Sequence, residues 1–133
     1  LGFERSGPER FLSTFGVLDA LVRGAGSGSV DHDPRIGAAI GRIAGLRRMS
    51  RAVSESLQRG EDAALPASVI KILGTGLEGD IAQLADELVG YNAADTELAE
   101  LVRAGVMQRP GFTLRGGTSE ILRGVVARGL GLR

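Results

Sequence analysis

Apolar residues recur every three or four positions along most of this chain, and no stretch of any length alternates apolar with polar residues. The recurring pattern is typical of amphipathic helices, whereas alternation would indicate half-buried strands. Long helical segments are predicted over residues 1–24, 33–60, 66–89 and 95–108, with a short one near the C-terminus. Such helices, joined by short turns, bury their apolar stripes against one another. We therefore predict an all-α fold, an up-down helical bundle of four main helices plus a short C-terminal helix, in one domain over residues 1–133.

Proline and glycine mark the predicted helix ends. Pro8 suits the first turn of the first helix, although a longer helix with Pro8 near its start is equally compatible with the sequence. Asp33-Pro34 is predicted to start the second helix, as an N-cap followed by proline at the first helical position. Gly60 is placed to stop the second helix and Pro110 to stop the fourth. The Gly/Ser-rich residues 24–30 are predicted to form a loop. The predicted core positions include Phe11, Phe15, Leu18, Val22, Ile40, Met49, Leu73 and Met107.

The third predicted helix contains three glycines, Gly74, Gly76 and Gly79. Each costs about 1 kcal/mol of helix propensity relative to alanine. Burial must outweigh this cost, and small residues would allow a neighbouring helix to approach closely.

Composition narrows the class of protein. The 133 residues are 43% hydrophobic and 24% charged, with 16 basic and 16 acidic residues, which argues against general attraction to nucleic acid or to an anionic membrane. The absence of cysteine excludes disulfides and thiolate metal sites, and we expect a cytoplasmic location and no membrane span. A single histidine, His32, cannot form a two-histidine metal site. Because the chain begins at Leu1 without methionine, we interpret it as a fragment of a longer chain.

Residues 115–123 form the most informative motif. The glycine pair Gly116-Gly117 allows the backbone to turn and a ligand to approach, and the hydroxyl residues Thr118 and Ser119 suit a helix start. The unpaired N–H groups and the positive dipole end of such a start can bind an anion. The plainer interpretation is a cap that binds nothing, although Ile121 stands where a capping box would need an acidic partner.

The run Gly-Gly-Thr-Ser-Glu-Ile-Leu-Arg over residues 116–123, followed by Val-Val-Ala-Arg-Gly-Leu-Gly-Leu over residues 125–132, resembles the C-terminal signature of acyl-CoA dehydrogenases. These flavoenzymes oxidise acyl-CoA thioesters to enoyl-CoA, and their C-terminal domain is a helical bundle. The resemblance implies that Thr118, Ser119 and Glu120 contact FAD. It also implies that Gly117 lines the acyl-CoA pocket and that Gly116 leaves room for the thioester.

Two other segments support the resemblance. Residues 1–5, Leu-Gly-Phe-Glu-Arg, are similar to the Leu-x-x-Glu-Arg sequence that opens this domain in many members. Residues 67–90, from Ala-Ser-Val-Ile-Lys-Ile through Leu-Val-Gly, are similar to the third helix of bacterial members. The three similarities occur in the family's order.

The resemblance leaves the catalytic base in a less common position. Many members carry a glutamate immediately before the Gly-Thr of the tail, but this chain has Gly116, which cannot accept a proton. A minority place the base at the glutamate of Leu-x-x-Glu-Arg, which matches Glu4, and a carboxylate in an apolar cleft has a raised pKa that suits this task. The alternative is that Glu4 is a first-turn acid with Arg5 as its ion-pair partner. The pair Glu9-Arg10 is a weaker rival.

The sequence also departs from the family. Its usual Arg-x-x-Phe-Gly segment is replaced by residues 23–28, and its Gly-Gly-x-Gly-Tyr loop by residues 108–112. These losses resemble diverged bacterial subunits that work in unlike pairs. The leading hypothesis is an FAD-dependent acyl-CoA dehydrogenase that passes electrons to an electron-transfer flavoprotein or similar acceptor, as a homo- or hetero-oligomer. The alternative is a non-catalytic partner subunit or oligomerisation module.

Overall fold

The structure is a computed structural model, which describes residue 7, residues 10–89 and residues 96–132. In these residues it has five helices and no strand: α2 (Phe15–Ser27), α3 (Pro34–Gln58), α4 (Ala64–Val89), α5 (Thr96–Phe112) and α6 (Ser119–Gly129). The predicted up-down bundle of four main helices with a short C-terminal helix is confirmed.

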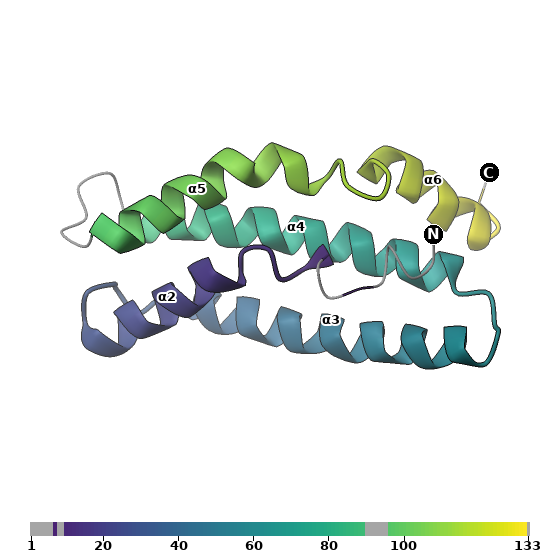
Figure 1. Ribbon diagram of the computed structural model, residues 1–133, viewed down its shortest axis with the longest axis horizontal. Coiled ribbons are helices and arrows are strands. Elements are labelled where there is room, and N and C mark those ends of the chain that lie inside the picture. Colours follow the sequence, from purple (N-terminus) through teal and green to yellow (C-terminus); the bar gives the residue numbers. More distant parts are fainter. Residues whose placement is uncertain (1–6, 8–9, 90–95, 133) are drawn as a thin grey trace.

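Helix α4 is the centre of the bundle and contacts each of the other four helices. Figure 1 shows α3 lying antiparallel along one side of α4, with α2 packed beside them. On the other side, α5 follows the second half of α4 and α6 follows its first half. The loop that carries the tail motif, between α5 and α6, therefore lies near the middle of α4.

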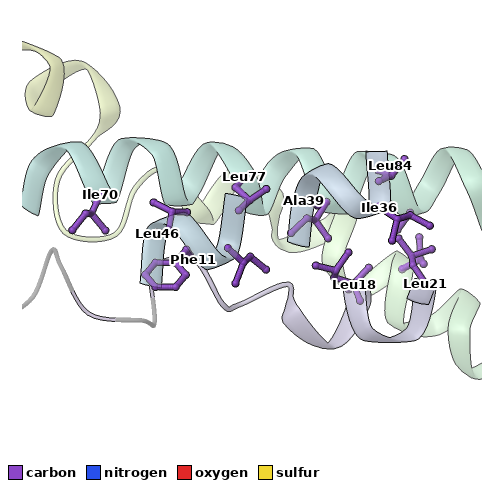
Figure 2. Close-up of a cluster of buried hydrophobic side chains, with 14 of the residues drawn as sticks. Phe11, Leu18, Leu21, Ile36, Ala39, Leu46, Ile70, Leu77 and Leu84 are labelled. Carbon is purple, nitrogen blue, oxygen red and sulfur yellow. The ribbon is translucent and has the colours of Figure 1, made fainter. Parts of the chain in front are cut away.

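The buried side chains form one continuous cluster. Figure 2 shows it running along α4, from Ile70 and Phe11 at one end to Leu84 and Leu21 at the other. Burial of this apolar surface is the main force that holds the helices together, because most of the stability of helices in proteins comes from the packing of their apolar faces.

Both predicted ends of α3 are confirmed. The Asp33 side chain accepts a hydrogen bond of 2.8 Å from the backbone N–H of Arg35, and Pro34 occupies the first helical position. At the other end Gly60 has φ of 75°, a left-handed conformation that favours glycine. The local sequence is sufficient to predict these two helix ends, because the cap and the glycine stop each act within one helical turn.

The prediction for the first helix was wrong about its start and its buried side. Residues 10–14 are not α-helical, and α2 begins at Phe15. Phe15 is 51% exposed and Val22 is also exposed, whereas Leu18 and Leu21 are buried. The apolar residues of this segment are numerous enough to fit more than one stripe, so the neighbouring helices decide which side is covered.

The predicted loop over residues 24–30 was also wrong in part, because α2 continues to Ser27. The helix ends at Gly28, where φ is 79°, and the backbone N–H of Ser29 donates to the carbonyl oxygen of Gly24 over 2.9 Å. A Cβ atom on Gly24 would lie 2.6 Å from Cγ2 of the buried Val30. Gly24 therefore serves the packing of the helix end rather than a flexible loop.

Pro110 does not stop α5, contrary to the prediction, since the helix continues to Phe112. Proline removes one N–H donor and disfavours the helix interior. Phe112 is buried, and the burial of its ring offsets this local cost. Three other predicted core positions, Ile40, Leu73 and Met107, are exposed.

Candidate functional site

The tail motif turns sharply before the last helix. Gly116 and Gly117 have φ of 68° and 100°, and no residue other than glycine has positive φ in the part of the chain that the structure describes. Side chains with a Cβ rarely adopt these angles. The predicted role of the glycine pair as a backbone turn therefore has a direct structural counterpart.

Thr118 is the N-cap of α6, as its position in the motif indicated. Its backbone is extended, and its Oγ1 accepts a hydrogen bond of 3.5 Å from the N–H of Ile121. The pKa of Glu120 is below its ordinary value, first because the carboxylate accepts from its own backbone N–H and next because it accepts from the Thr118 hydroxyl. The nearby charges of Arg123 and Lys71 act in the same direction. The Thr118 side chain is thus engaged within the helix start.

The motif remains accessible from outside the bundle. Residues 116–119 are partly exposed and Glu120 is exposed. The Ser119 hydroxyl forms no hydrogen bond to any residue that the structure describes. A glycine turn without Cβ atoms, a free hydroxyl and the positive end of a helix suit an anionic group such as the phosphates of a nucleotide cofactor.

Arg115 connects the motif to a neighbouring hollow. Its guanidinium lies 5.5 Å from the centre of the Phe112 ring, a distance at which the cation attracts the ring face. The two residues line the hollow together with Met107, Gln108 and Gly111. Met107, predicted to fill the core, is 77% exposed beside it.

Two buried charged residues of α4 contact the chain just before the glycine pair. Lys71 Nζ donates to the carbonyl oxygen of Thr113 over 3.0 Å. Glu78 Oε2 accepts from Nη2 of Arg115 over 3.3 Å, and Glu78 Oε1 accepts from the backbone N–H of Ser13 over 2.8 Å. Both α4 side chains are fully buried.

Lys71 and Glu78 were not among the residues predicted from the sequence, although a signal for them exists. Positions on the buried side of α4 recur in steps of four and three: Ala67, Lys71, Gly74, Glu78, Ile81 and Ala85. Two charges on such a stripe need buried partners, because an unpaired charge in the interior is very costly. Their partners could not be named from the sequence.

The structure does not test the predicted base. Glu4, with Arg5 and Glu9, lies outside the described residues. In the described part of the chain no helix is long and apolar enough to cross a membrane, and no three acidic or histidine side chains gather as they would around a metal ion.

The geometry defines a class of protein: a helical-bundle domain whose last helix begins, after a glycine turn, at a partly exposed surface. A family model described as "Acyl-CoA dehydrogenase, C-terminal domain" matches residues 34–131, which is well over half of the chain and includes the tail motif. The chain therefore belongs to the acyl-CoA dehydrogenase family, as the resemblance of the tail indicated. Comparison with curated proteins and with solved structures finds no match.

Proposed function

We propose that this chain is the C-terminal domain of an FAD-dependent acyl-CoA dehydrogenase, which oxidises an acyl-CoA thioester to the 2,3-enoyl-CoA. The observation that carries the proposal is the partly exposed start of α6 after two left-handed glycines, within the residues that the family model matches. FAD, when bound, supplies the acceptor for the hydride that leaves the β-carbon.

The residues of this chain have distinct roles in the proposal. Ser119 binds FAD through its hydroxyl, and Thr118 and Glu120 contact it at the same helix start. Gly116 and Gly117 leave room for the thioester, because neither carries a side chain. Glu4 accepts the α-proton, since Gly116 leaves the more common position of the base without a carboxylate.

The complete enzyme needs more than this domain. We expect the other parts of the flavin and acyl-CoA sites to come from further domains of a longer chain. We also expect the enzyme to be a homo- or hetero-oligomer and to be located in the cytoplasm. An electron-transfer flavoprotein or similar acceptor would reoxidise the flavin.

The proposal is tested by purifying the full-length protein alone and measuring its bound flavin and its activity. We expect a yellow, FAD-loaded protein that reduces an artificial electron acceptor when an acyl-CoA is supplied. Glu4→Gln should lower kcat by about a hundredfold or more, the usual contribution of a positioned base, while FAD remains bound. Glu9→Gln is the matched control and should keep its turnover. Unchanged turnover in Glu4→Gln would remove Glu4 from the mechanism.

A non-catalytic subunit is the second candidate. It is favoured by the glycine at position 116 and by the large apolar side chains that residues 107–132 expose: Met107, Leu114, Ile121, Leu130 and Leu132. Exposed apolar surface of this kind often marks a contact with a partner. A full-length protein that is colourless alone and takes up flavin only with a second chain would favour this function over the first.

A further inference from the structure

Two ionisable side chains lie in the interior of this small bundle. The side chains of Lys71 and Glu78 are both 0% exposed, on the central helix α4. They are two helical turns apart, since seven residues span about two turns of 3.6 residues, so they lie on the same side of α4. Buried charges are tolerated only where they are paired and hydrogen-bonded. Their partners therefore indicate what the charges are for.

Both charges reach the same short segment of chain. Lys71 Nζ binds the carbonyl oxygen of Thr113, and Glu78 Oε2 binds the guanidinium of Arg115. These anchor points immediately precede Gly116 in the sequence. The loop between α5 and α6 is thus tied to the central helix at two places just before the glycine turn.

Ser13 contacts both Glu78 and Arg115. Its backbone N–H donates to Glu78 Oε1 over 2.8 Å, and its Oγ lies 3.0 Å from Nη2 of Arg115. The segment that leads into α2 therefore contacts the same carboxylate and the same guanidinium as the tail loop. Hydrogen bonds to a carboxylate are stronger than those between neutral groups, and the Glu78 side chain is shielded from water, although Arg115 and Ser13 are exposed.

The glycine turn makes such anchoring necessary. Gly116 and Gly117 supply no side chain to fix the direction of the chain, and glycine has the widest choice of backbone angles. On the C-terminal side, the fully buried Leu122 holds α6 in the bundle. On the N-terminal side, Thr113 and Arg115 are the points at which α4 holds the loop.

We propose that Lys71 and Glu78 are positioning residues that, through Thr113 and Arg115, fix the glycine loop and the start of α6 in the orientation that receives the flavin. The inference rests on the proposed function, because it assigns a support to the same site. Neither side chain touches the ligand. A shift of about 1 Å in a binding group can cost a hundredfold in rate, so a support of this kind affects function out of proportion to its distance.

The test compares Glu78→Gln with Asp80→Asn in the full-length protein. Both changes convert a carboxylate of α4 to its amide and break an ion pair with arginine, but Asp80 is exposed and pairs with Arg42 of α3. Glu78→Gln should speed amide hydrogen exchange across residues 112–121 and weaken FAD binding about tenfold, which corresponds to 1.4 kcal/mol. Asp80→Asn should change neither. Lys71→Met, which removes the other anchor, should reproduce the effects of Glu78→Gln.

A general loss of stability is distinguished by a third variant. Val53→Ala removes buried methyl groups from α3, away from the loop, and should lower the melting temperature without changing FAD affinity. If Glu78→Gln does not fold, Arg115→Gln breaks the same contact from the outside, because the Arg115 side chain is 42% exposed.

The outcomes separate this inference from the proposed function. Normal FAD affinity and unchanged exchange over residues 112–121 in Glu78→Gln would overturn the positioning role and leave the flavoenzyme intact. A wild-type protein that binds no FAD would overturn the flavin site, and with it the inference about the flavin, while the exchange data would still show whether Glu78 holds the loop.

Discussion

Gly74 of α4 lies against the backbone of Arg10, so closely that a Cβ atom at position 74 would be 2.5 Å from the Arg10 carbonyl oxygen. The same atom would be 3.0 Å from Cβ of Phe11, which is fully buried. The expectation that a glycine in this helix permits close approach is therefore met at Gly74, although the approaching segment precedes α2 and is not one of the α-helices. This contact brings residues 10–13 onto α4 between Lys71 and Glu78.

Gly74→Ala should destabilise the bundle by about 1–3 kcal/mol, because a backbone carbonyl cannot move aside as a flexible side chain can. Gly76→Ala is the matched control two residues further along α4, where nothing lies within 4 Å of the added atom. That variant should gain up to about 1 kcal/mol from helix propensity. Urea unfolding followed by circular dichroism measures both. Equal effects at the two positions would contradict the packing argument.

Gly117→Ala tests the turn of the tail motif. A Cβ atom there would meet Leu122 only at an ordinary distance of 3.7 Å, so the cost comes from the φ of 100°. We expect a loss of about 1–2 kcal/mol in unfolding free energy and weaker FAD binding in the full-length protein. Gly124→Ala, inside α6, is the control, and it should be neutral or stabilising. A Gly117→Ala protein as stable as wild type would show that the turn can adopt another conformation without cost.

Thr14→Val should stabilise the protein by about 1 kcal/mol. The Thr14 hydroxyl is buried and has no hydrogen-bond partner among the described residues, and although Thr14 is the N-cap of α2, its side chain does not cap the helix. Valine has nearly the same shape and avoids burying an unsatisfied hydroxyl. Thermal unfolding of the two proteins gives the comparison, with Thr118→Val as a contrast that should be destabilising because that hydroxyl does cap a helix. A lower melting temperature for Thr14→Val would reveal a partner for its hydroxyl.

Glu61 should titrate at unusually low pH. Hydrogen bonds from Arg59 and Ser56 lower the pKa of its carboxyl from 4.5 to about 2. Since the folded-state pKa is below the unfolded value, this group stabilises the fold above the unfolded pKa, and the contribution disappears as pH falls toward 2. Arg59→Gln should move the pKa of Glu61 upward, as read from its side-chain carboxyl resonance during an NMR titration. Arg51→Gln, which breaks the neighbouring pair with Glu55, should leave that resonance nearly unchanged.

Sequence reasoning succeeded where the signal is local. The Asp33-Pro34 helix start, the Gly60 stop and the Thr118 cap each depend on contacts within one turn. The predictions were wrong where a neighbouring segment decides which residues of a helix are buried. Phe15 and Phe11 both fit the predicted apolar stripe, but only Phe11 packs beneath α4, because the chain is not helical at residue 11.

The sequence by itself determined that the chain forms helices, where α3 begins and ends, and which family its tail belongs to, because periodicity, caps and motifs are written in consecutive residues. Only the tertiary structure decided which groups Lys71 and Glu78 contact. Arg115 stands 37 residues from Glu78 along the chain, and only the packing of α5 and α6 against α4 brings the two charges together. The free energy of a buried charge depends on its partners in space, which no local pattern can supply.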